Sequence, residues 1–160
     1  MNSILTRWFG RKLRLSEAGP RDAAAFAALH AAAFRRGWSE EEFERLLTER
    51  NVVAHRATRG RSLAGFILSR IAGGEAEILS VAVARRRRGR GIGRSLLELH
   101  LRRLAGLDVR TVFLEVDEDN VPAVRLYVRA GFHEVGRREG YYAQAGRPAA
   151  SALVLRRNLT

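Results

Sequence analysis

Glycines and arginines between Val81 and Arg94 have the clearest chemical signature in the chain. Gly89, Gly91 and Gly93 stand where an apolar strand pattern gives way to a helical one, and glycine allows a ligand to approach the main chain closely. The first N–H groups of a helix have no partners within it and carry partial positive charge, so they suit an anion. Arginines in the same turn add planar donors that match phosphate. The segment predicts a pocket for a phosphate or pyrophosphate, with a solvated basic loop as the alternative.

The elements around this turn follow from hydrophobic spacing. Residues 76–83 have the apolar character of a strand, and a helix follows the glycines and ends at Gly106. The apolar face of that helix consists of residues at helical spacing, namely Ile92, Leu96, Leu97, His100, Leu101 and Leu104.

A further strand and helix come next. Residues 111–116 alternate strictly between two faces. One face has Val112, Leu114 and Val116, and the other has Thr111, Phe113 and Glu115. Asn120 is a good N-cap for the next helix, and Pro122 fits its first turn. Gly131 is placed to end that helix.

The first third of the chain predicts a short strand at 13–15, two helices and a hairpin. Pro20 opens the first helix, whose apolar side is predicted to be Ala25, Phe26, Leu29, Ala33 and Phe34. Ser39 followed by Glu42 is a capping box for the second helix. Residues 52–57 and 63–71 are predicted strands with a turn between them, and Gly73–Gly74 makes the next turn. At the other end, 132–137 predicts a strand, 140–148 a loop and 152–155 the start of a last strand.

Because the early strands are joined by tight turns, we expect a mixed α/β fold with a largely antiparallel sheet. The sheet should have about six or seven strands, flanked on both faces by about four helices. The 160 residues predict a single domain. Residues 1–12 are a basic segment that either packs on the domain through Trp8 and Phe9 or is loose.

Composition narrows the function classes. The formal net charge of +12 favours acidic partners such as nucleotide-like cofactors, ribosomes, nucleic acid or anionic membrane. The absence of cysteine excludes disulfides, thiol nucleophiles and thiolate metal sites. The four histidines lack metal-ligand spacing, and neither Ser80 nor Ser95 has a paired histidine for a Ser-His relay. No apolar run is long enough for a signal peptide or a membrane span, so we expect a soluble cytoplasmic protein. We also expect a monomer or weak dimer that needs no metal and has neither DNA nor a membrane as partner.

From about Gly37 to Leu155 the chain resembles the GNAT superfamily of acetyl-CoA-dependent N-acetyltransferases. The family's pyrophosphate motif, Q/R-x-x-G-x-G/A, reads R-G-R-G-I-G at 88–93. It is followed by F-L-E-V at 113–116, N-x-x-A-x-x-L-Y at 120–127 and G-F at 131–132. Together with A-F at 33–34, G-W-S at 37–39 and Y-Y at 141–142, the set is most similar to the ribosomal-protein-alanine N-acetyltransferase (RimI-type) branch.

The resemblance implies acetyl-CoA as co-substrate and a protein N-terminus as acceptor, such as the N-terminal alanine of a small-subunit ribosomal protein. It implies Glu115 as general base and Tyr127 as general acid. The strand end at 81–83 would pair with the pantetheine arm, and the turn would hold the pyrophosphate. The implied cofactor residues are Val81, Ala82, Val83, Arg88, Gly89, Arg90, Gly91, Ile92, Gly93, Arg94 and Asn120. The implied acceptor residues are Trp38, Tyr141 and Tyr142.

One departure concerns the acceptor side. Many relatives carry an acidic residue just before the last strand, where this chain has P-A-A-S at 148–151. Each implied role also has a structural alternative. Glu115 could be a solvent-facing strand residue, Tyr127 a core residue and Asn120 only a helix cap, while Tyr141 and Tyr142 could merely fill a loop.

Reference acidities favour an N-terminal acceptor. An α-amine has a pKa of ~7.7–8.0 and lysine ~10.4, a difference of about 2.5 units or roughly 3.4 kcal/mol of deprotonation cost. A single carboxylate is therefore adequate for an N-terminus. Proton transfer from a tyrosine (~10) to a leaving thiolate (~8.5) is uphill by about 2 kcal/mol, which positioning can offset.

Two competing functions remain open at this stage. One keeps the fold and cofactor but uses a lysine, polyamine or small-molecule amine as acceptor. The other is a basic ribosome- or RNA-binding module without catalysis, although the aromatic residues do not interleave with the basic run.

Overall fold

The computed structural model describes residues 12–144 and 147–159, which contain seven strands, four α-helices and two short 3-10 helices. The first six elements in chain order are β1 (Leu13–Glu17), η1 (Pro20–Asp22), α2 (Ala23–Ala33), α3 (Glu40–Thr48), β2 (Val52–Arg59) and β3 (Ser62–Ala72). The remaining elements are β4 (Glu75–Val83), η2 (Arg85–Arg87), α4 (Ile92–Gly106), β5 (Thr111–Asp117), α5 (Val121–Arg129), β6 (His133–Gln144) and β7 (Arg147–Asn158).

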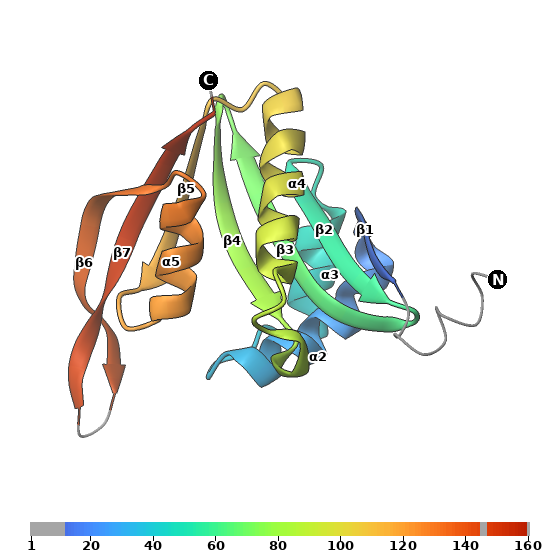
Figure 1. The fold of residues 1–160 in the computed structure, drawn as a ribbon, viewed down its shortest axis with the longest axis horizontal. Helices are drawn as coiled ribbons and strands as arrows, with labels where there is room; N and C mark the ends of the chain where they lie inside the picture. The colour runs from blue at the N-terminus through green and yellow to red at the C-terminus, as the bar shows by residue number, and fades with distance from the viewer. Residues whose placement is uncertain (1–11, 145–146, 160) are drawn as a thin grey trace.

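All seven strands form one sheet in the order β1-β2-β3-β4-β5-β7-β6 (Figure 1). Every neighbouring pair is antiparallel except β4 and β5, which are parallel. The predicted mixed, largely antiparallel sheet is therefore confirmed. None of the described helices is long and apolar enough to span a membrane.

The two parallel strands pair over only part of their length. Their register runs from Glu75 opposite Thr111 to Ile78 opposite Leu114, although β4 continues to Val83 and β5 to Asp117. Beyond these pairs the strands spread apart, which Figure 1 shows at the carboxyl ends of β4 and β5. The sheet therefore has an opening in its middle.

A β-bulge in β4 lies where the two strands part. Leu68 of β3 is opposite Ser80 and Ser69 is opposite Ile78, so Leu79 is the extra residue. An extra residue shifts the alternation of side chains by one position. Ile78, Val81 and Val83 therefore all contact the same core, whereas Ala82 contacts the other.

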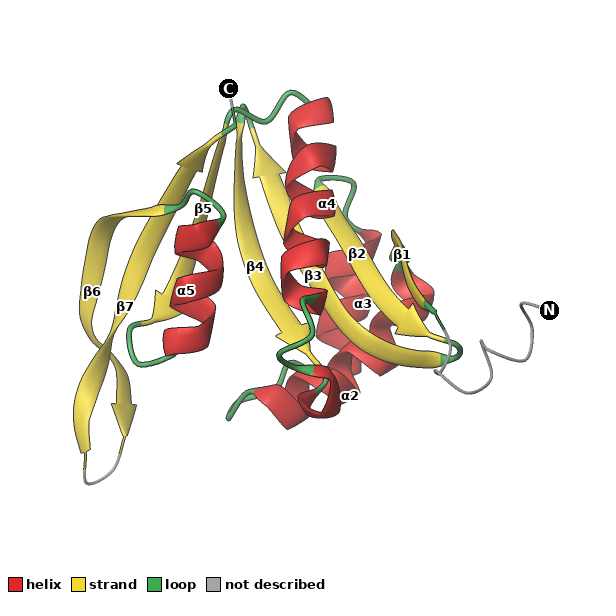
Figure 2. Cartoon of the chain, viewed as in Figure 1, coloured by secondary structure: helices red, strands yellow, loops and turns green. Residues whose placement is uncertain are grey.

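Helices cover both faces of the sheet (Figure 2), and each face has its own core. On one face, the predicted apolar residues of α4 pack with Ile67, Val112 and Leu114, and the ring of Tyr127 on α5 joins them. On the other face, Phe26 of α2 and Phe43 of α3 pack on Phe66 and Leu68. The alternation predicted for β5 is confirmed, because Val112, Leu114 and Val116 are buried on the α4 side.

A polar cluster lies inside the α4 core. His100 of α4 is fully buried, with its Nδ1 atom 2.8 Å from Nδ1 of His55 and its Nε2 atom 2.6 Å from Oγ of Ser69. The expectation that His100 is a core residue with hydrogen-bond partners is confirmed.

The buried face of α2 differs from the prediction. Ala25 is exposed and Phe34 is 40% exposed, whereas Ala23, Phe26 and His30 are buried. The prediction placed no polar residue on this face, but His30 is buried because its Nδ1 atom accepts a hydrogen bond from the backbone N–H of Trp38 at 3.0 Å. Phe34 is the C-cap of α2 and has an extended backbone, so it lies beyond the helical face, and its half-exposed ring stacks on His30 with centroids 4.3 Å apart.

The loop predicted at 140–148 is wrong for residues 140–144, which belong to β6, and for residues 147–148, which belong to β7; residues 145–146 lie outside the described residues. Register shifts after Arg138 and after Tyr142 interrupt the alternation that would have revealed these strands. Pro148 is tolerated because β7 pairs with β5 only from Ala152 onward, so this end of β7 pairs with β6 alone. The basic segment at residues 1–12, predicted to pack or to be loose, lies almost entirely outside the described residues.

Candidate active site

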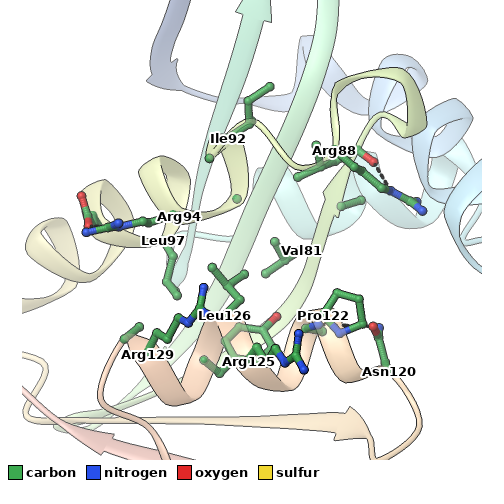
Figure 3. Close-up of a pocket in the computed structure, with 18 of the residues that line it drawn as sticks. Val81, Arg88, Ile92, Arg94, Leu97, Asn120, Pro122, Arg125, Leu126 and Arg129 are labelled. Carbon is green, nitrogen blue, oxygen red and sulfur yellow. Dashed lines mark hydrogen bonds and ion pairs between the residues drawn. The ribbon is translucent and has the colours of Figure 1, made fainter.

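A cavity of about 1360 Å³ lies between the amino-terminal half of α4 and the helix α5 (Figure 3). The end of β4, the loop that follows it and the end of α2 complete its wall. The predicted residues that line it are Val81, Ala82, Val83, Arg88, Gly89, Gly91, Ile92, Gly93, Arg94, Asn120 and Tyr127. Arg90, Glu115 and Trp38 are not among the described residues that line it.

The glycine turn has the backbone that an anion site requires. Gly89 and Gly91 have φ of 77° and 78°, in the left-handed region that favours glycine. Gly91 is the N-cap of α4, and no side chain caps the helix there. A Cβ atom added at Gly89 or Gly91 would meet no heavy atom within 4 Å. The N–H groups of the first turn of α4 are thus left for a ligand, with open space above them.

Six arginines line the cavity, and three of them are engaged within the protein. The Arg88 Nε atom donates to the carbonyl oxygen of Val83 at 3.1 Å, which holds the loop against the end of β4. Arg94 pairs with Glu98 at 3.0 Å, one turn further along α4. Arg157 donates to the carbonyl oxygen of Ala130 at 2.6 Å. Arg90 is exposed on the turn.

Glu115 lies at the opening of the sheet. It is the first residue of β5 beyond the last pair with β4, and it faces the side opposite Leu114 and α4. Its side chain is 25% exposed, and its Oε1 atom lies 3.0 Å from Nη2 of Arg138 on β6. Glu115 is therefore neither buried nor freely solvated, because a cation orients the carboxylate beside the opening.

Tyr127 borders the cavity from the other face of the sheet. It is 7% exposed and packs edge-on against Phe132, with ring centroids 5.8 Å apart. Its hydroxyl forms no hydrogen bond with the described residues. Burial raises the pKa of Tyr127 above its ordinary value, so the hydroxyl stays protonated well into the alkaline range. Tyr127 is therefore both a core residue and a residue of the cavity wall.

Asn120 likewise both caps a helix and lines the cavity. Its side-chain oxygen accepts from the backbone N–H of Ala123 at 3.3 Å, which confirms the predicted N-cap of α5. It also lines the cavity next to Pro122. Its amide N–H group has no partner among the described residues and can donate to a ligand.

The predicted acceptor residues are placed differently. Trp38 stacks on His30 with centroids 4.7 Å apart and packs against Phe43, so it supports the α2–α3 region from within. Phe34, whose spacing predicts a core position, lines the cavity instead. Tyr141 and Tyr142 belong to β6, but their side chains lie outside the described residues.

Sequence reasoning missed two further features. Arg125 and Arg129 of α5 line the cavity; their i, i+4 spacing was a signal that could have placed them on one helix face. Ser80, beside the bulge, is buried with no hydrogen-bond partner for its Oγ atom among the described residues. Only knowledge of the bulge could have found it.

A mixed sheet that parts between two parallel strands, with a helix start suited to an anion beside the gap, is the arrangement of a protein that binds a phosphate-bearing ligand next to an opening in its sheet. The residues fit acetyl-CoA, since the cavity joins a phosphate-binding turn to apolar walls from Val81, Leu97 and Leu126. Residues 23–132 match the model of the acetyltransferase (GNAT) family, and the chain belongs to that family. It is an acetyl-CoA-dependent N-acetyltransferase.

Named relatives lie in two groups. The chain is 33% identical over 105 residues to the [ribosomal protein bS18]-alanine N-acetyltransferase of Escherichia coli K12, covering 66% of this chain and 70% of that protein. The crystal structure of the ribosomal-protein-S18-alanine N-acetyltransferase from Escherichia coli superposes with a TM-score of 0.86 at 26% identity, covering 93% and 95% of the two chains. The chain is also 42% identical over 78 residues to mycothiol acetyltransferase of Streptomyces bingchenggensis, covering 48% of this chain but only 25% of that protein.

Proposed function

We propose that this enzyme acetylates the α-amino group of a protein N-terminus, with the N-terminal alanine of a small-subunit ribosomal protein as its acceptor. The observation that carries the proposal is the opening between β4 and β5, which has Glu115 on one face and the cavity with Tyr127 on the other. A thioester entering from the cavity and an amine entering from the opposite face would meet at this opening. The match to the ribosomal-protein-alanine N-acetyltransferases supports this choice of acceptor.

The cofactor roles proposed for the cavity residues follow from their positions. The N–H groups after Gly89 and Gly91 bind the pyrophosphate of acetyl-CoA, because no side chain competes for them. Beyond Ile78, the edge of β4 has no strand partner on the β5 side. Its backbone at 81–83 can therefore hydrogen-bond the amides of the pantetheine arm. Asn120 contributes its side-chain amide at the start of α5.

The proton transfers are assigned to the two faces of the opening. Glu115 accepts the proton that the acceptor amine releases, directly or through a water. Tyr127 donates its hydroxyl proton to the sulfur that leaves. Burial raises the pKa of Tyr127, so its hydroxyl keeps the proton until the thiolate forms, and the same desolvation would make that thiolate a stronger base.

A second acceptor class is supported by a separate observation. The identity to mycothiol acetyltransferase is higher, although over a shorter stretch, and that name indicates a small-molecule acceptor. A small-molecule amine is therefore the alternative acceptor for the same chemistry. A binding module without catalysis is not favoured, because the cavity meets the sheet opening rather than an exposed basic face.

Substituting Glu115→Gln tests the proposed base. Removal of a general base lowers kcat by about 100-fold or more, while binding of acetyl-CoA should be unchanged. The matched control is Glu77→Gln, a carboxylate on β4 opposite Phe113 in the paired part of the strands. It should retain full activity.

Steady-state kinetics with an N-terminal alanine peptide, together with calorimetric titration of acetyl-CoA, separates these effects. If Glu115→Gln and Glu77→Gln behave alike in kcat, Glu115 is not the base.

A further inference from the structure

The three cavity arginines not engaged within the protein are Arg87, Arg125 and Arg129, which form no hydrogen bond or ion pair with any described residue. Arg87 lies on η2 beside the glycine turn. Arg125 and Arg129, the α5 arginine pair, lie one turn apart on α5 and face the cavity from the side opposite Ile92 and Arg94 (Figure 3).

The α5 arginine pair lacks a counterion. Like charges at i, i+4 destabilise a helix, and the only carboxylate among the described lining residues is Glu98, which Arg94 already binds. Arginine forks that face a cavity without a protein acceptor suit a phosphate ligand. The pair is also on a different element from the glycine turn, so it forms a second anion subsite.

The co-substrate, acetyl-CoA, carries two chemically distinct phosphate groups. Its pyrophosphate fits the main-chain N–H groups of the glycine turn, which is rich in glycine and open above. Its ribose carries a 3′-phosphate monoester, whose charge is about −1.5 to −2 near neutral pH. A dianion on the far side of the cavity from the turn would meet the two unengaged guanidinium groups of α5.

We propose that Arg125 and Arg129 bind the 3′-phosphate of coenzyme A, and that the enzyme thereby discriminates against 3′-dephospho-coenzyme A. The inference rests on the proposed function, since it assigns a second subsite within the same cavity. The helix α5, which contains Tyr127 and has Asn120 as its N-cap, would then also determine which acyl donor the enzyme binds.

Calorimetric titration of coenzyme A and of 3′-dephospho-coenzyme A tests the subsite. The wild type should bind coenzyme A at least about tenfold more tightly, the expected effect of charge-assisted hydrogen bonds. The double variant Arg125→Gln/Arg129→Gln should bind both ligands with the affinity that the wild type has for the dephospho form. Arg102→Gln, an exposed arginine on α4 outside the cavity lining, is the matched control and should retain the preference.

Two results would overturn the inference. One is equal affinity of the wild type for both ligands, and the other is an equal loss of affinity for both in the double variant. If the wild type binds both ligands equally and still transfers acetyl groups, only the subsite is wrong. If it binds neither ligand, the proposed function fails as well.

Discussion

At the scale of single residues, several side chains of this site both stabilise the fold and present a polar group to the site. Asn120 caps α5 through its side-chain oxygen while facing the cavity. Tyr127 fills the core with its ring, while its hydroxyl forms no hydrogen bond with any residue that the structure describes. Arg138 pairs with Glu115 across β7, which orients the carboxylate. Such residues can be altered at their polar atoms with little change in packing.

Tyr127→Phe removes the hydroxyl and keeps the ring against Phe132. If the hydroxyl is the general acid, kcat should fall by about 100-fold while the melting temperature changes little. Because burial raises the pKa of Tyr127, the wild-type hydroxyl stays protonated as the pH rises, and kcat should show no alkaline loss from this group below about pH 10. A pH–rate profile of both proteins, with the exposed Val128→Ala as control, checks this. Unchanged kcat in Tyr127→Phe would remove Tyr127 from the mechanism.

At the scale of elements, strand and helix patterns were predictable because their apolar spacing is regular. The α4 face, the capping box of Ser39 with Glu42 and the β5 alternation all agree with the structure. The bulge at Leu79 was not predictable, since an extra residue between two apolar positions leaves no local signal. The hairpin of β6 and β7 was missed because its pairing shifts register and its sequence contains Gly140 and Pro148.

Close packing of α4 on the sheet gives a stability prediction. A Cβ atom at Gly65 of β3 would lie 2.9 Å from the carbonyl oxygen of Ala82 and 3.1 Å from Cδ1 of Leu96. Gly65→Ala should therefore destabilise the protein by about 1–3 kcal/mol, the cost of overpacking a core. Gly106→Ala, whose Cβ would meet nothing within 4 Å at the end of α4, should be neutral or stabilising by up to about 1 kcal/mol. Urea unfolding compares the two; equal stability would show that the α4–sheet spacing adapts freely.

The histidine cluster that joins β2, β3 and α4 makes stability depend on pH. Burial, and then the charge of His55, lowers the pKa of His100 from 6.5 to about 3. Burial also lowers the pKa of His55. Between pH 6.5 and about 3 the unfolded chain binds more protons at His100 than the folded chain does. The contribution of His100 to the free energy of unfolding is therefore fully present above pH 6.5 and is lost as the pH drops toward 3. At pH 5 the loss of stability from His100 is about 2 kcal/mol.

Urea unfolding at pH 7.5 and pH 5 measures this loss. The double variant His55→Leu/His100→Leu should lose less stability between the two pH values than the wild type does. His133→Asn, which alters an exposed histidine of β6, should retain the wild-type difference. An identical pH dependence in all three proteins would contradict the assignment to the cluster.

At the scale of the whole molecule, the sheet separates two routes to one opening. The cavity and its arginines lie on the α4–α5 side, and Glu115 faces the side of α2 and α3. The sequence predicted the phosphate-binding turn, and its resemblance to the GNAT family pointed to Glu115 and Tyr127 as the proton-transfer residues. Spacing alone could not show that these two residues lie on opposite faces of the sheet. That arrangement depends on where β4 and β5 cease to pair, which is a property of the assembled sheet.

The most direct test of the proposed function is acetyl transfer from acetyl-CoA, followed by mass spectrometry with two peptides. One peptide has a free N-terminal alanine and no lysine, and the other has a blocked N-terminus and an internal lysine. The proposed function predicts that only the alanine peptide gains an acetyl group, because its α-amine is already partly deprotonated near neutral pH. Acetylation of the lysine peptide alone, or of neither peptide by an enzyme that binds acetyl-CoA, would contradict it.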